Sequence, residues 1–186
     1  IVYPPLKQKG GKCTVDYTPE EYSKYYITQA LFKLMQEYEY EKISVTDIVK
    51  KAGVGRVTFY RHFKNKEDVI LFYFEHNRKS FQLEQHFFAR TREDYLQVVT
   101  SVFRLFRENA LTLKLLRRAR LEYIYLDYLN KHFAQKFKED HPESDGYAPY
   151  LYAGMLFNVS MAWLDNDCRE SPEQLALAMV NAIYPA

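Results

Sequence analysis

A pair of short amphipathic segments joined by a glycine turn constrains this chain more than any other feature of its sequence. Ser44 and Asp47 have the spacing of a capping box, in which side-chain oxygens accept hydrogen bonds from the free N–H groups at a helix start. The apolar residues that follow recur at helical spacing: Val45, Ile48, Val49 and Ala52. Because Gly53 comes directly after them, we expect a helix of only two turns that ends there.

The second segment, residues 56–63, has a similar length and a more polar surface. Phe59 and Phe63 are four residues apart, so both side chains fall on one face of a helix and can be buried together. The rest of the segment carries cations and hydroxyl groups: Arg56, Thr58, Tyr60 and Arg61. Two short helices with a tight turn between them predict a helix-turn-helix, whose second helix can enter a DNA major groove.

The remainder of the chain also predicts helices. Thr18-Pro19-Glu20-Glu21 combines an N-cap, a proline at the first helical position and a capping box, and Ser171-Pro172-Glu173 repeats the cap and the proline. Asn65 can cap a further helix that begins at Lys66 and runs beyond Phe81. Only 6 Gly and 7 Pro occur, too few for a turn-rich β-sandwich, and no segment alternates strictly between apolar and polar residues. We therefore predict an all-α protein of about nine helices.

Positive charge is concentrated on the predicted helix-turn-helix. The whole chain has a formal net charge of only +2. Residues 42–66 contain seven lysines and arginines and one acid, Asp47, which gives a local charge of +6, whereas residues 81–186 contain 12 basic and 14 acidic residues. A local basic segment is typical of nucleic-acid binding, although a solvated surface face explains the charge equally well.

Residues 27–70 closely resemble the N-terminal DNA-binding module of the TetR family of transcriptional regulators. The resemblance is carried by SVTDI at residues 44–48, AGV at 52–54 and TFYRHFKNK at 58–66. It implies a three-helix DNA-binding domain over residues 18–64 and a larger helical domain for dimerisation and effector binding over residues 65–186. Outside the module the likeness is architectural, except that Gly154, Trp163 and the SPE at residues 171–173 resemble the family's dimerisation helices.

The same resemblance assigns DNA contacts to eight residues. They are Thr46, Arg56, Val57, Thr58, Tyr60, Arg61, His62 and Lys66. Thr46, Tyr60 and Lys66 are placed on phosphates, and residues 56–58 with Arg61 on base edges or the adjoining backbone. Arginine can bind guanine through two hydrogen bonds, and Thr and Val methyl groups can meet a thymine methyl. The alternatives that stay open are a half-buried aromatic at Tyr60, a surface lysine at 66, and packing of His62 against the preceding helix.

Two features depart from the family pattern. Gly55 stands where a bulkier polar residue is common, which leaves the first base contact undefined. The segment before Thr18 is longer than the family requires, and its lysines form either a DNA-reaching arm or plain solvated charge, of which we favour the second. These lysines are Lys7, Lys9 and Lys12.

Residue patterns for other kinds of site are absent from the sequence. The five histidines include no pair four residues apart, and none lies near a cysteine at metal-ligand spacing. The GVG at residues 53–55 joins two helices, whereas a dinucleotide-binding loop joins a strand to a helix. We therefore expect no enzymatic activity, no metal ion and no cofactor.

Two further features concern the compartment. Cys13 and Cys168 are far apart in a chain without a disulfide-rich composition, which favours a reducing compartment and hence the cytoplasm. Residues 146–164 form an uncharged run as long as a membrane span, but Asn158 and Ser160 lie within it. We expect a helix covered by protein and no membrane contact.

The leading hypothesis is a ligand-responsive repressor that binds a palindromic operator as a homodimer. Residues 146–164 and 172–183 are expected to pack against their symmetry mates as a four-helix bundle. The 17 Tyr and 13 Phe favour a small apolar or aromatic effector, and only an inward-pointing arginine group at residues 117, 118 and 120 would favour an anionic one. One alternative is a TetR-like adaptor or activator whose C-terminal part binds a protein, as in the branch that partners dihydroxyacetone-kinase-like subunits. A helical enzyme or binding protein is the other.

Overall fold

The structure, a computed structural model, describes residues 18–77, 91–140, 142–143 and 146–183. Within these residues there are nine α-helices and no strand, so the prediction of an all-α fold is confirmed. The helices are α1 (Pro19–Glu37), α2 (Val45–Ala52), α3 (Arg56–His62), α4 (Lys66–Asn77), α5 (Arg92–Glu108), α6 (Ala110–Arg118), α7 (Tyr123–Asp140), α8 (Ala148–Asp165) and α9 (Pro172–Ile183), with a 3-10 helix η1 (Tyr40–Lys42). The expected continuation of α4 beyond Phe81, and the lysines at 7, 9 and 12, lie outside the described residues.

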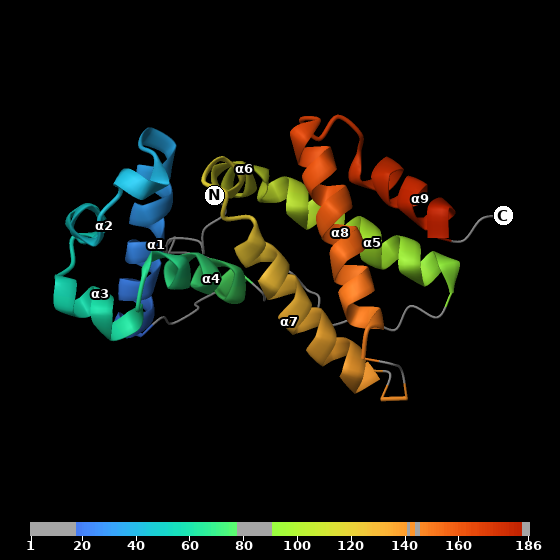
Figure 1. The fold of residues 1–186 in the computed structure, drawn as a ribbon, viewed down its shortest axis with the longest axis horizontal. Coiled ribbons are helices and arrows are strands. Elements are labelled where there is room, and N and C mark those ends of the chain that lie inside the picture. Colours follow the sequence, from blue (N-terminus) through green and yellow to red (C-terminus); the bar gives the residue numbers. More distant parts are fainter. Residues whose placement is uncertain (1–17, 78–90, 141, 144–145, 184–186) are drawn as a thin grey trace, which may run out of the picture.

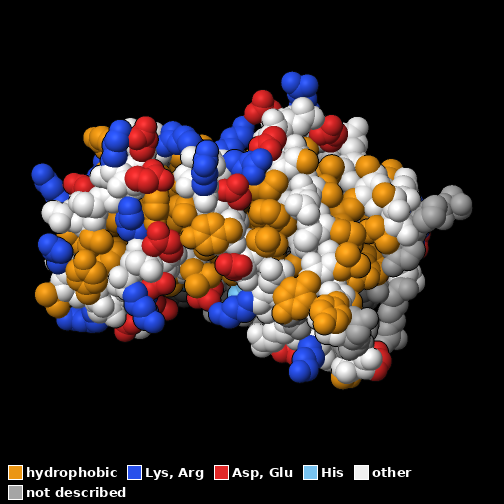
Figure 2. Space-filling view, in the orientation of Figure 1, with side chains coloured by type: hydrophobic (Ala, Val, Ile, Leu, Met, Phe, Trp, Pro, Cys, Tyr) orange, Lys and Arg blue, Asp and Glu red, His pale blue; other side chains and the backbone are white. Residues whose placement is uncertain are grey.

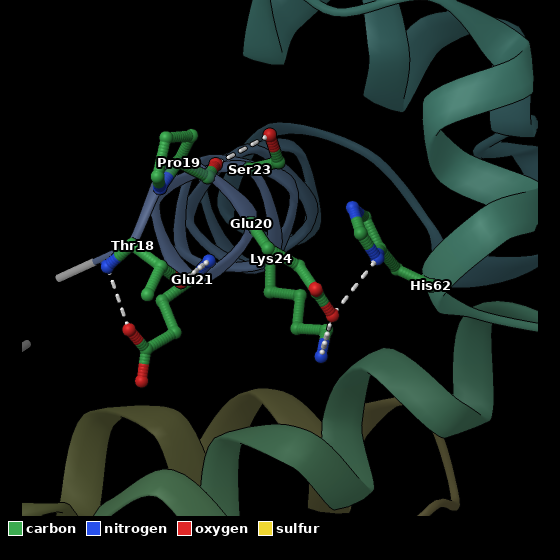
Figure 3. A network of polar contacts seen from close by, with 7 residues as sticks. All are labelled: Thr18, Pro19, Glu20, Glu21, Ser23, Lys24 and His62. Atoms are coloured by element: carbon green, nitrogen blue, oxygen red, sulfur yellow. Dashed lines mark hydrogen bonds and ion pairs between the residues drawn. The ribbon is translucent and has the colours of Figure 1, made fainter.

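The helix starts follow from their capping residues. At α1, Glu21 N donates to Thr18 Oγ1 at 3.2 Å and Thr18 N donates to Glu21 Oε2 at 2.7 Å (Figure 3). Ser44 and Asp47 form the same reciprocal pair at the start of α2. A third capping box, at Thr91 and Asp94, begins α5 and was not identified from the sequence.

The helices form two groups with α4 between them (Figure 1). In the first group α1 packs against α2 and α3. In the second, α5 packs along α9 and α7 along α8. Two helices contact both groups, since α4 packs against α1 and α7, and α6 packs against α1 and α5. The helix-turn-helix therefore lies at one end of the molecule and is joined to the rest through α4 and α6.

The C-terminal group is built around aromatic rings. Trp163 of α8 packs against Phe103 and Phe106 of α5, with ring centroids 5.8 and 6.2 Å apart. Phe74 of α4 lies 5.1 Å from the ring of Tyr125 in α7, so α4 is anchored in the same cluster. No helix in the described part of the chain combines the length and apolar character needed to cross a membrane.

Candidate nucleic-acid interface

The helix α3 has one buried and one exposed face, as its sequence predicts. Phe59 and Phe63 are buried in the core that α1 contributes to. On the opposite side the side chains reach the surface: Val57 is 74% exposed and Tyr60 53% exposed. Five of the eight predicted contact residues are exposed at the start of α2 and along α3, namely Thr46, Arg56, Val57, Tyr60 and Arg61, and Thr58 is partly exposed.

The ring of Tyr60 contacts two neighbours on α3 while more than half of the residue stays exposed. Its ring meets the Phe59 ring edge-on at a centroid distance of 5.4 Å. The Arg56 guanidinium carbon lies 5.9 Å from the centre of the same ring, one helical turn earlier. The half-buried alternative for Tyr60 therefore does not describe its position, because more than half of the residue is exposed.

The cations on α3 and just after it have no carboxylate partner among the described residues. In the part of the chain that the structure describes, no carboxylate lies within 4.0 Å of the side-chain nitrogens of Arg56, Arg61 or Lys64. Asp47 is the only acid within residues 42–66, and it is bound to Ser44 in the capping box. These hydrogen bonds lower the pKa of the Asp47 carboxyl. The surface of α3 thus presents uncompensated positive charge beside hydroxyl and methyl groups.

His62 differs from the other predicted contact residues. Its side chain is only 5% exposed and faces α1, with Nδ1 3.8 Å from Glu20 Oε1 (Figure 3). Glu20 is also paired with Lys24 at 2.8 Å. Burial lowers the pKa of His62, and the nearby Lys24 adds to this effect while Glu20 opposes it. The sequence-based assignment of a DNA contact to this side chain is therefore corrected: His62 packs α3 against α1.

The side chain of Lys66 is also engaged within the protein. Its Nζ donates to the carbonyl oxygens of Tyr40 at 2.8 Å and Ile43 at 2.9 Å and lies 3.9 Å from the centre of the Tyr40 ring. The Tyr40 hydroxyl in turn donates to Glu67 Oε1 at 2.6 Å, and burial with this carboxylate raises the pKa of Tyr40. The ammonium group of Lys66 is thus not the free cation that a surface phosphate contact would use.

The start of α3 has no side-chain cap. Gly55 occupies the N-cap position with an extended backbone, and no side chain accepts a hydrogen bond from the first turn. A Cβ added there would meet no atom within 4 Å. The first side chains that α3 offers to a ligand are therefore those of Arg56 and Val57.

A second surface, on α8 and α9, is apolar and uncovered in the single chain. Leu151 is 64% exposed and Leu177 is 43% exposed. The same outward sides carry small or uncharged residues at helical spacing: Gly154, Met155, Asn158 and Ala162 on α8, and Ala178 and Asn181 on α9. Figure 2 shows hydrophobic side chains gathered over the part of the molecule where α8 lies. Met161, in contrast, is 4% exposed and points into the chain's own core.

The described residues lack the side-chain clusters that other kinds of site would need. No group of three or more His, Cys, Asp and Glu side chains is arranged to hold a metal ion there. The arginines at the end of α6 and just after it do not line an enclosed site: Arg117 is paired with Asp165 at 2.7 Å and with Glu122 at 3.0 Å, and Arg120, which follows α6, is exposed.

The sequence has known relatives. The family of bacterial regulatory proteins called the tetR family has a model that matches residues 27–71. The HTH-type dhaKLM operon transcriptional activator DhaS of Lactococcus lactis subsp. lactis (strain IL1403) is 41% identical over 51 residues, 27% of this chain and 27% of that protein. The HTH-type transcriptional regulator SAB2452 of Staphylococcus aureus (strain bovine RF122 / ET3-1) is 33% identical over 69 residues, 37% of this chain and 36% of that one. The chain thus spans about a third or less of the length of these curated relatives.

The fold extends the likeness over most of the chain. Lin0861 from Listeria innocua superposes with a TM-score of 0.76 at 21% identity, covering 93% of this chain and 94% of that one. The transcriptional regulator FadR from Bacillus subtilis, in complex with stearoyl-CoA, has a TM-score of 0.55 at 20% identity and covers 87% and 97%. At these identities the likeness concerns the fold alone. The family model thus matches the helix-turn-helix of this chain, and the architecture is shared with these solved structures, so the DNA-binding module is similar to that of the tetR family of bacterial regulatory proteins.

Proposed function

We propose that this protein is a transcriptional regulator, without enzymatic activity, that binds a palindromic operator as a homodimer in the cytoplasm. The observation that carries the proposal is the exposed face of α3, where Arg56 and Arg61 have no protein carboxylate as a partner among the described residues. Such a face attracts phosphate and can offer hydrogen bonds to base edges. The DNA-binding unit in this proposal comprises residues 18–64, and residues 65–186 supply dimerisation and effector binding.

Each surface residue has a role that its chemistry and position support. Arg56, Val57, Thr58 and Arg61 read bases or the adjoining backbone, and Tyr60 and Thr46 donate to phosphates. Lys66 contributes only through its backbone N–H at the first position of α4, because its ammonium group is bound to Tyr40 and Ile43. His62 has no contact with DNA in this scheme.

The homodimer is supported by the uncovered faces of α8 and α9. No Lys, Arg, Asp or Glu occurs between residues 147 and 164, and the outward side of α8 includes Gly154, which allows another helix to approach closely. A two-fold contact would cover α8 and α9 of both chains at once. Two recognition helices related by this axis would read the two halves of a palindrome.

We propose that the regulator is a repressor released by a small apolar or aromatic effector. The support is the aromatic cluster of the C-terminal helices and the FadR fold, since FadR was solved with stearoyl-CoA. An activator that binds a protein through its C-terminal helices is the second candidate, favoured by the 41% identity over 51 residues to the activator DhaS. A purification that retains a stoichiometric protein partner, with no stabilisation by small molecules, would support the second candidate.

The operator proposal is tested by selecting bound duplexes from a random pool with the full-length protein. We expect a palindrome whose half-sites are centred about 34–36 Å apart, one turn of DNA. If the dimer neutralises about eight phosphates, the slope of log K against log salt is about −7. No enriched sequence, or a slope shallower than about −2, would contradict the proposal.

A further inference from the structure

The C-terminal end of α1 is capped by a residue from another part of the chain. The last turn of α1 contains Glu37 and no basic residue, and its C-cap, Tyr38, has an extended backbone rather than a left-handed one. Arg118, at the end of α6, donates through Nη2 to the carbonyl oxygen of Met35 and, at 3.4 Å, to that of Tyr38. A cation placed there satisfies carbonyl groups that the helix leaves without partners and interacts favourably with the helix dipole.

The backbone from the end of α1 towards α2 is held by a second cation, Lys66. We name residues 35–43, which comprise the last residues of α1 and the segment that follows them, the α1–α2 connection. Within it, the carbonyls of Tyr40 and Ile43 accept hydrogen bonds from Lys66 at the start of α4. The connection is thus fixed from two directions. Lys66 ties it to the helix that follows the helix-turn-helix, and Arg118 ties it to the C-terminal group.

Between α6 and the α1–α2 connection there is an open cleft of about 420 Å³. One wall is formed by residues 37–41 and the other by Leu115, Arg118 and Ala119. The Arg118 hydrogen bonds to Met35 and Tyr38 join the two walls across this cleft.

The opposite end of α6 is fixed to α4. The Tyr73 hydroxyl donates to Asn109 Oδ1 at 2.5 Å and lies 3.3 Å from Thr112 Oγ1, and all three residues are buried. With its start held in this buried network, α6 can act as a rigid support for Arg118 at its other end.

We propose that Arg118 is a positioning residue for DNA binding: it fixes the orientation of α1, α2 and α3 relative to the C-terminal helices. The inference rests on the proposed function, since orientation matters when two recognition helices must meet two half-sites. A fixed orientation raises the effective concentration of the second recognition helix once the first is bound, without any added DNA contact.

The test compares Arg118→Ala with Arg117→Ala in the full-length protein. The control removes the same charge from the adjacent residue, whose partners Asp165 and Glu122 lie outside α1, α2 and α3. For Arg118→Ala we expect affinity for the selected two-half-site duplex to fall about tenfold while affinity for a single half-site changes less than about twofold. Arg117→Ala should change neither. Equal losses of affinity on both duplexes would show that Arg118 only stabilises α1. An unchanged or increased ratio of two-half-site affinity to single-half-site affinity would also overturn the proposal.

A second measurement does not need DNA. Trp163 is the only tryptophan, so energy transfer from it to a label on Lys50→Cys, in a chain with Cys13 and Cys168 replaced by Ser, reports the separation of the C-terminal helices from α2. Labelled chains are diluted into unlabelled ones so that transfer occurs within one chain. We expect a wider distance distribution for Arg118→Ala than for wild type or Arg117→Ala, and an unchanged width would contradict the inference. If wild type binds no duplex, the proposed function fails while this measurement still decides whether Arg118 fixes the orientation.

Discussion

Tyr60 and Arg61 are neighbours on α3 and both are exposed, yet we expect them to affect DNA binding differently. A tyrosine hydroxyl on a phosphate adds affinity without sequence information, so Tyr60→Phe should weaken operator and random duplexes alike. An arginine that binds a guanine edge adds discrimination, so Arg61→Ala should cost about 1–3 kcal/mol on the operator and reduce preference at one base pair. Affinities for the operator, its single-base variants and random DNA test both variants. Equal losses on operator and random DNA for Arg61→Ala would make it a phosphate contact instead.

The buried His62 predicts a pH dependence of stability. Its pKa in the folded protein is lowered by burial and by Lys24, so the unfolded chain takes up the proton first as pH falls. The free energy of unfolding should therefore decrease as pH falls below about 6.5, the pKa of histidine in an unfolded chain, until the folded pKa is passed. His62→Gln should remove this component. Chemical denaturation between pH 8 and 5 measures it, and parallel pH profiles for the two proteins would exclude it.

The turn between α2 and α3 contains two glycines with opposite expected responses to substitution. Gly53 has φ +69°, a left-handed conformation, so Gly53→Ala should destabilise the fold by about 1–2 kcal/mol although space is available. Gly55 is an N-cap in extended conformation with open space, so Gly55→Ser should add a cap and stabilise by about 0.5–1 kcal/mol. Thermal unfolding of the two variants tests this difference in sign, and a stabilising Gly53→Ala would contradict it.

The same elements show what could be predicted from sequence. The capping boxes at Thr18 and Ser44 and the burial of Phe59 and Phe63 depend on residues three or four apart, so local pattern was sufficient. The contacts of Lys66 and Arg118 could not be predicted this way, because their carbonyl partners lie 23 to 83 residues away along the chain.

Interface residues on α8 were also beyond prediction. Residues 148–164 are uncharged on every side of the helix, so periodicity could not separate the side that packs inward from the side left uncovered. Residues 146–164 were accordingly expected at the dimer contact as one segment, but Met161 within it is buried inside the single chain. The structure instead leaves Leu151 and Leu177 exposed.

At the scale of the whole molecule, substitutions at Leu177 and Met161 separate the effects of dimerisation from those of folding. Leu177→Asp puts a charge on the uncovered side of α9 and should give folded monomers that lose tight operator binding. Met161→Asp buries an unpaired charge and should lower the thermal stability of the chain itself. Sedimentation and thermal unfolding distinguish the two outcomes. A Leu177→Asp protein that remains dimeric would remove α9 from the proposed contact.

Effector and operator should bind antagonistically if the protein is a ligand-responsive repressor. Because α4 and α6 join the aromatic cluster to the helix-turn-helix, a ligand that favours another placement of these helices changes the separation of the two recognition helices. Linkage requires the operator to weaken ligand affinity by the same factor by which ligand weakens operator affinity, typically about 1–3 kcal/mol. Trp163 is 3% exposed and its Nε1 donates to no protein acceptor in the described residues, so its fluorescence should report a ligand bound beside it.

Titration of apolar, cationic and anionic compounds, each with and without the selected operator, measures this coupling. We expect hits among the apolar compounds, because the arginines of α6 are engaged with Asp165, Glu122 and the end of α1 rather than with a buried anion site. Arg118→Ala should reduce the coupling, since a helix-turn-helix that is less firmly oriented responds less to movement of α6. Ligands whose affinity is the same with and without operator would refute antagonism, and a retained protein partner in place of any ligand would favour the activator.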